Sequence, residues 1–378
     1  MTTPHELMAD INATLKSPVL KMASDESLKV TYIPTGVLPI DSLLQGGIPR
    51  GRFTTITGDW STLKSYVGLS TIAQEQFNGG TCALIDTEHS FDPEWATQLG
   101  VDVDSLMLSR PESGEMAIDA AETLIRGGAT LVVFDSVAAA LPEAERDKRL
   151  HKERVQPART AALMSVAMRK LTAANTHTAM IWVNQLRMNV GVTFGNPEVA
   201  TGGRALPFYS SYIVNIKKTG KVTRNVPAWD GEKWIEVKET YAQKFRAYVE
   251  KSKLSSPHRE VHFTWDYEAN GVDEIGYLIA CGLESGHITQ KGAVWTYDGQ
   301  TYRGKDKFKE AVRTNSAMQG KMRSQALPAL FPGSHEAAKS KADKPRKPRS
   351  KTTVRKATRT RAQGASSTTA VRKRPSSK

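Results

Sequence analysis

The segment from Gly58 to Ser65 carries the residue types needed to hold a chain of phosphates. It fits the pattern G-x-x-x-x-G-K-[ST], except that Leu63 stands where the second glycine is expected. In this pattern backbone N–H groups surround the phosphates, the lysine neutralises outer oxygens, and the hydroxyl binds Mg²⁺. The residues predicted to bind phosphates are Gly58, Asp59, Trp60, Ser61, Thr62, Leu63, Lys64 and Ser65. An accidental Lys-Ser pair in a loop is the alternative.

Two carboxylates follow other apolar runs of the chain. Asp135 follows the run Leu131–Phe134, where it would complete a Mg²⁺ shell with Ser65, or else cap the next helix. Glu88 lies just beyond the run Cys82–Ile85 and would polarise a water for attack on a terminal phosphate, unless it is a surface or capping residue. A phosphate loop and two acids at three strand ends rarely coincide by chance. Together they predict ATP chemistry assisted by Mg²⁺.

Two segments could contact a polynucleotide. The first, Glu145–Gln156, is strongly basic, although a solvated helix face would have the same composition. The second runs from Asn184 to Gly203, is rich in glycine, and can present arginine to phosphates and apolar groups to bases. Gln185, at its start, could hydrogen-bond a terminal phosphate and so couple the nucleotide to the order of the loop. A plain connector is the alternative.

The elements that must position these residues alternate between strand and helix. Short apolar runs separated by helical patterns predict an α/β fold, with a mostly parallel sheet covered on both faces. Ligands of such sheets bind at the carboxyl ends of the strands, where the candidate residues lie. The predicted strands are Phe53–Thr57, Cys82–Ile85, Leu131–Phe134 and Ala179–Val183, and the predicted helices are Tyr66–Phe77, Met116–Arg126 and Pro157–Ala174.

Composition divides the 378 residues into four parts. Residues 1–34 contain an amphipathic helix that starts at Thr3 as N-cap, with Leu7, Ile11 and Leu15 on one stripe. Residues 35–259 form the predicted catalytic core, and residues 260–332 a small α/β domain. Residues 333–378 have almost no large hydrophobic side chains, and we predict that they are disordered.

The net charge of +13 is concentrated in one segment. Residues 337–378 hold 15 Lys and Arg against the single acid Asp343, so this tail carries +14 and the rest of the chain −1. The tail therefore predicts binding to a polyanion. No apolar run is long enough to span a membrane, and no secretory signal is visible. The two cysteines, Cys82 and Cys281, lie in apolar contexts and are predicted to be buried thiols.

These motifs resemble those of the bacterial RecA recombinases over about 290 residues. The resemblance lies in 85–93 (Ile-Asp-Thr-Glu-His-Ser-Phe-Asp-Pro), 133–139 (Val-Phe-Asp-Ser-Val-Ala-Ala), 164–171, the loop from Asn184-Gln185 to Gly202-Gly203, and 271–296. It implies a P-loop ATPase core of the RecA type, with a small N-terminal helix–strand element and a small C-terminal α/β domain. The loop signature is far more specific than the phosphate loop alone.

Carried over by position, the resemblance implies a role for each matching residue. The catalytic residues would be Glu88, which activates water, Lys64, and Gln185, which senses the γ-phosphate. Ser65 and Asp135 would hold Mg²⁺. ATP would also contact Asp92 and Trp95, which stacks on adenine, and the neighbouring protomer's ATP would contact Lys251 and Lys253. DNA would contact Arg149, Lys152, Arg154, Arg169, Arg187, Met188, Asn189, Val190, Gly191, Phe194, Gly202 and Gly203.

Three departures set this chain apart from the family pattern and favour a phage-type or divergent member. Leu63 replaces a glycine, Ala162 stands where the family has an arginine, and the tail is basic where the family tail is acidic. An insertion around Pro227–Gly231 also makes the alignment of Lys251 and Lys253 less secure.

The resemblance implies an ATP-dependent recombinase that forms a helical filament on single-stranded DNA and promotes strand exchange with a duplex. The expected cofactors are ATP and Mg²⁺, and the expected place is the cytoplasm of a bacterial or phage-infected cell, away from membranes. Single-strand-binding and loader proteins are further partners that the family allows. Two other functions stay open: a motor ATPase of the helicase or packaging type, and a basic DNA-coating protein with weak ATPase activity.

Overall fold

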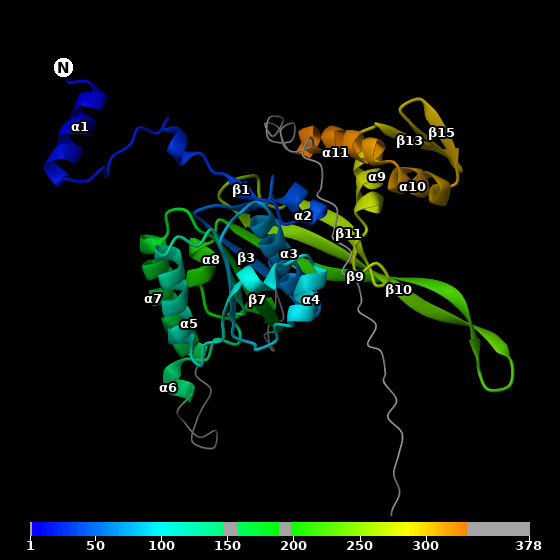
Figure 1. The fold of residues 1–378 in the computed structure, drawn as a ribbon, viewed down its shortest axis with the longest axis horizontal. Coiled ribbons are helices and arrows are strands. Elements are labelled where there is room, and N and C mark those ends of the chain that lie inside the picture. The colour runs from blue at the N-terminus through cyan, green and yellow to red at the C-terminus, as the bar shows by residue number, and fades with distance from the viewer. Residues whose placement is uncertain (1, 147–156, 189–197, 331–378) are drawn as a thin grey trace, which may run out of the picture. The chain divides into compact units, whose positions relative to one another are not determined.

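The computed structural model describes residues 2–146, 157–188 and 198–330. Within them, a ten-stranded sheet runs in the order β12-β11-β10-β9-β3-β7-β6-β4-β5, with β8 paired to β7 (Figure 1). Neighbouring strands from β9 to β5 are parallel, whereas β10, β11 and β12 are antiparallel. The strands are β3 (Phe53–Gly58), β4 (Cys82–Asp86), β5 (Met107–Ser109), β6 (Leu131–Asp135), β7 (Ala179–Met188), β8 (Glu198–Ala200), β9 (Tyr212–Trp229), β10 (Trp234–Ser252), β11 (Glu260–Asp266) and β12 (Gly271–Val272).

Helices cover both faces of this sheet because its central strands are apolar on both sides. Along β6, Leu131 and Val133 pack into one core, while Val132 and Phe134 pack into the other. The first core includes residues of α2 (Leu38–Leu43), α3 (Lys64–Phe77) and α4 (Pro93–Gln98), and the second includes residues of α5 (Gly114–Arg126), α7 (Pro157–Ala174) and α8 (Ala205–Tyr209). The prediction of an α/β fold with a mostly parallel sheet is confirmed.

The predicted strands and helices all form, but several extend beyond the expected ends. Each strand continues through the polar residue that follows its apolar run, so that Gly58, Asp86 and Asp135 end β3, β4 and β6. The ladder hydrogen bonds continue to these residues even though the apolar pattern stops before them. The described chain also contains five smaller elements: η1 (Glu26–Leu28), β1 (Tyr32–Ile33), β2 (Ile48–Pro49), η2 (Val103–Ser105) and α6 (Glu143–Arg146).

The N-terminal helix α1 (Pro4–Leu15) begins as its sequence predicts. The Thr3 hydroxyl accepts from the Glu6 amide, and the Glu6 side chain accepts from the Thr3 amide. No residue of α1 is buried, and Leu7 and Leu15 are 54% and 55% exposed. Its apolar stripe therefore has no partner among the described residues.

Strands β9 and β10 form a long antiparallel ribbon that runs out from the sheet (Figure 1). The segment around Pro227–Gly231, which the sequence marks as an insertion, is the far end of this ribbon. Strand β11 pairs with β10 only from Ala242 to Tyr248, so the outer part of the ribbon has two strands. The insertion is thus an extension of two regular strands.

A smaller unit follows the large sheet. It contains α9 (Glu274–Glu284), a three-stranded sheet of β13 (Ile288–Lys291), β14 (Val294–Tyr297) and β15 (Gln300–Arg303), α10 (Lys305–Thr314) and α11 (Ser316–Leu330). Its core includes Trp295 stacked on Phe308. The predicted start of this unit at residue 260 falls inside the large sheet, because β11 and β12 hydrogen-bond there. The change in residue pattern near residue 260 reflects the antiparallel edge strands β11 and β12. The smaller unit itself starts near Asp273.

Three further expectations concern side chains and termini. Cys82 is buried and Cys281 half-buried, and burial raises the pKa of both thiols. None of the described helices is long and apolar enough to cross a membrane. The predicted disorder of residues 333–378 concerns a segment outside the described residues.

Candidate functional site

Four chemically important positions lie within two residues of one another in register at the carboxyl edge of the sheet. Gly58 at the end of β3 pairs with Gln185 on β7, and Asp86 on β4 pairs with Asp135 on β6. Asp135 in turn pairs with Val183, two residues before Gln185. The parallel register thus brings the phosphate loop, the acids and the candidate sensor to one edge, as α/β ligand sites require.

The phosphate loop accommodates leucine without losing its shape. Leu63 has φ +65°, the left-handed conformation that glycine favours, and it immediately precedes α3. Its side chain is half-buried and packs against the first core. Gly58 cannot be replaced by a larger residue in the same way, because a Cβ there would lie 2.4 Å from the Thr62 hydroxyl and 2.5 Å from the Ile216 carbonyl oxygen. Leu63 therefore occupies the glycine position with the glycine conformation.

Lys64 and Asp135 face each other across the start of α3. The Lys64 ammonium is buried and donates to the Asp59 carbonyl oxygen at 2.6 Å. Burial lowers the pKa of Lys64, while the Asp135, Glu88 and Asp59 carboxylates oppose that shift. Burial also raises the pKa of Asp135 to about 6, opposed by a hydrogen bond from Ser65. A cation entering this site would remove the desolvation penalty that the carboxylate carries.

The Ser65 hydroxyl and the Asp135 carboxylate together suit Mg²⁺. Both supply hard oxygen ligands, and Mg²⁺ in nucleotide sites takes one or two protein oxygens with the rest from phosphates and waters. Among the described residues, no group of three His, Cys, Asp or Glu side chains would hold a metal by itself.

Glu88 and Gln185 meet although they lie 97 positions apart in the sequence. The Gln185 amide donates to Glu88 Oε1 at 3.0 Å, and the buried Ser136 hydroxyl donates to the same oxygen. Thr87 fixes the backbone beside Glu88, since its hydroxyl donates to the Ser136 carbonyl and its amide to the Asp135 carbonyl. Glu88 is otherwise exposed, so its second oxygen can reach a water.

Asp86 has a supporting position that its sequence context does not reveal. Its buried carboxylate accepts from the Ser90 and Phe91 amides, each at 3.1 Å, and from Arg110 Nε at 3.2 Å. These bonds hold the loop that carries Glu88. Asp86 also contributes to the raised pKa of Asp135. The position of Asp86 at the end of a predicted strand was the sequence signal for this role. Its partner Arg110 lies 24 residues further along the chain, and no spacing rule connects these two residues.

A cavity of about 100 Å³ adjoins Ser65 and Asp135, the predicted Mg²⁺ ligands. Ser65 and Asp135 line one part of it, and Phe91, Asp92 and Trp95 line another. Asp92 caps α4 by accepting from the Glu94 and Trp95 amides at 2.8 and 3.3 Å. The indole of Trp95 is half-buried and packs against the first core. The predicted adenine-stacking residue is therefore in the same cavity as the predicted Mg²⁺ ligands.

Gln185 lies at the root of the predicted DNA loop. Strand β7 continues beyond it and pairs with β8, from Leu186 opposite Ala200 to Met188 opposite Glu198. The Asn184 amide donates to the Thr201 carbonyl at 2.7 Å and closes this stem. Asn189, Val190, Gly191 and Phe194 lie outside the described residues, as do Arg149, Lys152 and Arg154. The stem therefore joins the nucleotide edge to the predicted DNA loop.

The glycine pair at the end of the stem is closely packed. Gly202 and Gly203 have φ +92° and +71°, and a Cβ on Gly203 would lie 2.7 Å from the Ala161 Cβ on α7. Arg187 and Arg169 are both exposed, and Arg169 donates to the Ser165 carbonyl at 3.3 Å. The described part of the predicted DNA surface is thus formed by the stem, the glycine pair and α7.

Lys251 and Lys253 lie beside the end of α8. Lys251 Nζ donates to the Pro207 carbonyl and, at 3.0 Å, to the Phe208 carbonyl, while Lys253 Nζ donates to the Phe208 carbonyl at 2.9 Å. Burial and the neighbouring Lys253 lower the pKa of Lys251. Both ammoniums therefore cap carbonyls that α8 leaves without helical partners.

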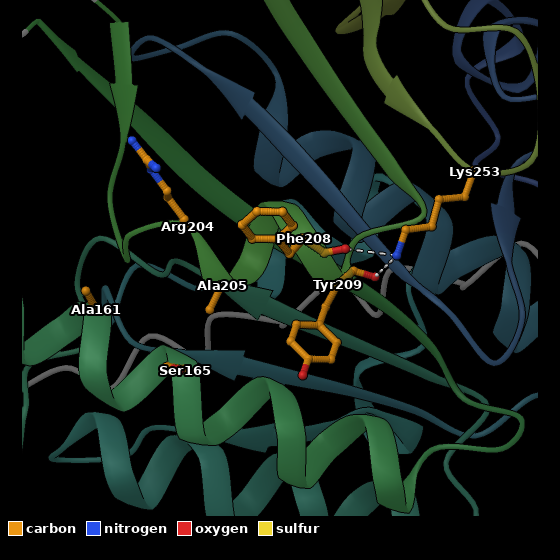
Figure 2. Close-up of a pocket in the computed structure, with 7 residues that line it drawn as sticks. All are labelled: Ala161, Ser165, Arg204, Ala205, Phe208, Tyr209 and Lys253. Carbon is orange, nitrogen blue, oxygen red and sulfur yellow. Dashed lines mark hydrogen bonds between the residues drawn. The ribbon is translucent and has the colours of Figure 1, made fainter.

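An open pocket of about 650 Å³ extends from Lys253 to α7 (Figure 2). Ala161 and Ser165 form its α7 side, and the exposed Phe208 ring stands near its rim with Arg204 on the opposite wall from Lys253 (Figure 2). Arg204 was not predicted as a functional residue, although it follows Gly203 directly.

Trp60 makes a contact that the sequence did not predict. Gly58 pairs with Ile216, so the residues that follow these two lie near each other. Lys218 Nζ lies 3.9 Å from the centre of the Trp60 ring. The ring is 73% exposed. The phosphate loop is thus tied to β9, the strand that continues into the long ribbon.

Comparison with known proteins identifies the family. A family model described as the RecA N-terminal domain matches residues 6–273 of this chain. The chain belongs to the RecA family. The RecA protein of Cutibacterium acnes is 39% identical over 305 residues, which are 79% of this chain and 83% of that protein. The RecA protein of Rhodospirillum centenum is 38% identical over 309 residues, 80% of this chain and 82% of that protein.

A third RecA protein matches a similar share of this chain. The RecA protein of Acidiphilium cryptum is 38% identical over 321 residues, which are 82% of this chain and 89% of that protein. The crystal structure of the RadB recombinase matches 64% of this chain and 98% of its own, with 18% sequence identity and a TM-score of 0.46. The resemblance of the sequence to the RecA family is confirmed by the family model and by the three RecA proteins.

Membership of the RecA family makes this chain an ATP-dependent recombinase, an enzyme that hydrolyses ATP in the presence of DNA. It acts in DNA recombination and repair and binds ATP and DNA. A motor ATPase and a DNA-coating protein are not favoured. The family also implies nucleotide binding with Mg²⁺ and assembly of identical copies into a filament.

Proposed function

We propose that ATP and Mg²⁺ bind between adjacent copies of this chain and switch its loops into a form that holds single-stranded DNA for pairing with a duplex. The observation that carries this proposal is the hydrogen bond between Gln185 and Glu88, beside the phosphate loop. It joins a candidate water-activating group to the root of the predicted DNA loop.

At the nucleotide, each residue has a separate task. Gly58, Lys64 and the loop between them bind the phosphates, Ser65 and Asp135 hold Mg²⁺, and Trp95 stacks on adenine with Asp92 beside it. Mg²⁺ supplies neutralisation of the charge that develops on the phosphate oxygens. Glu88 accepts a proton from the attacking water, and the Ser136 hydroxyl fixes the carboxylate in position. The exposure of Glu88 and the burial of Ser136 support this division.

Gln185 couples the nucleotide to DNA. A γ-phosphate offers the Gln185 amide a charged acceptor in competition with the Glu88 oxygen, which it already shares with Ser136, so the amide shifts toward the phosphate. Because Gln185 continues directly into the β7–β8 stem, this shift moves the segment that ends in Gly202 and Gly203. Arg169, Arg187, Met188 and the glycine pair then contact DNA. The residues proposed to join them, Asn189, Val190, Gly191, Phe194, Arg149, Lys152 and Arg154, lie outside the described part of the chain.

Two surfaces of the chain support filament formation. The exposed leucines of α1 form an apolar stripe that suits docking on a neighbouring copy, and the exposed Phe208 forms a second contact. Lys251 and Lys253 reach the ATP of that neighbour, whose phosphates replace the α8 carbonyls as acceptors. A nucleotide completed by two copies makes assembly depend on ATP.

The family supports action in the cytoplasm of a bacterial or phage-infected cell, with single-strand-binding and loader proteins as further partners. The basic tail adds contacts to DNA phosphates that do not depend on sequence. Hydrolysis resets the filament after pairing, since ADP no longer offers a γ-phosphate to Gln185.

The test is strand exchange between circular single-stranded DNA and a linear duplex, with ATP hydrolysis measured in parallel. We expect Lys64→Ala to abolish both activities and Glu88→Gln to lower hydrolysis by about 10²- to 10⁴-fold while DNA binding persists. Glu94→Gln, at an exposed glutamate of α4, is the matched control and is expected to behave as the parent protein. Equal rates of hydrolysis in the parent and both site variants would contradict the proposal, and closed rings in electron micrographs would favour a motor.

A further inference from the structure

The outer part of the β9–β10 ribbon, residues 222–240, has no place in the function described above. It contains only two strands, because β11 leaves the ribbon at Ala242. From Val222 to Trp229 it extends about 25 Å at roughly 3.3 Å per residue, and Figure 1 shows it leading away from the sheet. No residue in it is buried. An isolated two-stranded ribbon is marginally stable in water, so this one needs a surface to pack on.

The tip of this outer ribbon is closed by a well-defined turn. The Asp230 carboxylate accepts from the Glu232 and Lys233 amides at 2.9 and 2.8 Å, and the Asp230 amide donates to the Lys233 carbonyl at 3.1 Å. Trp229 and Trp234 lie opposite each other beside this turn, with ring centres 5.8 Å apart. They are 57% and 69% exposed. A preorganised turn therefore displays two indoles, the side chain most enriched at the energetic centres of protein interfaces.

The two faces of the outer ribbon differ. Opposite residues share a face, so the pairs Val226–Val237 and Ala228–Ile235 form an apolar stripe on one face. The tryptophan pair lies on the other face. An apolar stripe and two exposed indoles on one narrow element form a surface that water disfavours.

Charge distinguishes between the kinds of partner. The outer ribbon holds three basic and four acidic side chains, a net charge of −1, and Arg224 already pairs with Glu239 and Glu268. Nucleic-acid surfaces need a clear excess of positive charge, which this segment lacks. Mixed charges around exposed tryptophans suit a protein surface instead.

The position of the ribbon favours an identical copy as that protein. Strand β9 holds Trp60 of the phosphate loop through Lys218, four residues before the outer ribbon begins. In the proposed function the nucleotide at this loop lies between two copies, so the outer ribbon begins near the surface at which copies meet. A filament keeps each copy at a fixed short distance from the next, where a contact forms at high effective concentration.

We propose that the outer ribbon docks on a neighbouring copy of this chain in the filament, with Trp229 and Trp234 as its anchors. The proposal rests on the filament of the proposed function. Because every copy points the same way along such an assembly, the contact joins two different surfaces and repeats from copy to copy. Its effect is to stabilise the filament beyond the contacts that ATP provides.

The first experiment shortens the ribbon. Asn225 and Lys238 lie directly opposite each other, so replacing residues 226–237 by Asn-Gly closes a two-residue hairpin at that point. We expect the shortened protein and the double variant Trp229→Ser/Trp234→Ser to need about 3- to 10-fold more protein for half-coverage of single-stranded DNA with a non-hydrolysable ATP analogue. Binding of that analogue without DNA should match the parent. Phe77→Ser removes an aromatic that is 83% exposed elsewhere and serves as the control.

The second experiment identifies what the tip touches. Lys233→Cys places a thiol on the tip, and a maleimide photocrosslinker will label it selectively, because Cys82 is buried and burial raises the pKa of both native thiols. We expect crosslinks between two copies that appear only when filaments form. Crosslinks to DNA, or none in filaments, would overturn the proposal, as would unchanged assembly of the shortened protein. Loss of the filament itself in the parent would instead overturn the proposed function.

Discussion

In the proposed function, the carboxylate of Glu88 and the amide of Gln185 form the smallest unit that links hydrolysis to DNA binding. One glutamate oxygen is shared by two donors, Ser136 and Gln185, which leaves the other oxygen for water. A γ-phosphate changes this arrangement by competing for the amide. At the scale of single residues, therefore, the groups proposed to activate water and to sense the nucleotide belong to one hydrogen-bond network.

Leu63 gives a residue-scale prediction about the phosphate loop. Its left-handed conformation is tolerated because the leucine side chain packs on the core, but a β-branched side chain adds steric strain to the same backbone. We expect Leu63→Val to lower the free energy of unfolding by about 1–2 kcal/mol and to weaken ATP binding. Leu63→Gly should retain ATP binding, since glycine adopts this conformation freely. Chemical denaturation and titration with a fluorescent ATP analogue measure both effects, and a valine variant as stable as the parent would contradict the prediction.

Asp41 gives a second residue-scale prediction, on pH. Burial raises its pKa from 3.8 to about 7, although its carboxylate accepts from the Thr35 amide and hydroxyl at 2.6 and 2.7 Å. The folded chain therefore holds a proton that the unfolded chain releases above about pH 4. The stability from this group is fully present below about pH 4 and is lost as the pH rises toward 7.

The measurement compares the parent with Asp41→Asn, which does not titrate. We expect the parent's free energy of unfolding to fall relative to the variant's by about 2 kcal/mol between pH 5 and pH 7. Denaturant titrations at several pH values give this difference. Parallel pH profiles for the two proteins would show that Asp41 does not titrate in that range.

At the scale of elements, the β7–β8 stem connects the nucleotide edge to the predicted DNA loop. Gln185→Asn keeps the amide but shortens its reach by one methylene. We expect the gain in single-stranded DNA affinity on adding an ATP analogue to decrease about tenfold, the effect of losing one hydrogen bond to a charged group. Affinity without nucleotide should not change. Fluorescence anisotropy with labelled DNA measures both, and Gln98→Asn on the exposed face of α4 is the control.

At the scale of the whole molecule, the positive net charge lies in the C-terminal tail and not in the rest of the chain. The folded part is close to neutral, whereas residues 337–378 carry +14. If the tail engages about six phosphates of single-stranded DNA, it contributes about −4 to the slope of log affinity against log salt. Deleting residues 337–378 should flatten the slope by that amount and weaken duplex capture. A tail of the same composition in scrambled order should restore both, and an unchanged slope in the deletion protein would refute the prediction.

Local pattern was enough to predict the sheet and the residues along its edge. Apolar runs located β4, β6 and β7, because a buried parallel strand is apolar on both faces, and the β-rich run Phe53–Thr57 before Gly58 located β3. The same rule placed Gly58 and Asp135 at the carboxyl ends of strands. Local pattern misplaced the start of the small C-terminal domain at residue 260, because antiparallel edge strands have a mixed pattern that resembles that of a separate small domain.

The sequence by itself determined the family, the order of strands and helices, and the separation of a basic tail from a neutral body. These follow from residue type and short-range spacing, which act without distant partners. Only the tertiary structure decided that Gln185 meets Glu88, that Arg110 holds Asp86, and that the insertion becomes a ribbon ending in two tryptophans. Such contacts depend on strand register and on the fold bringing remote positions together, and no local pattern encodes the distance between two side chains 97 residues apart.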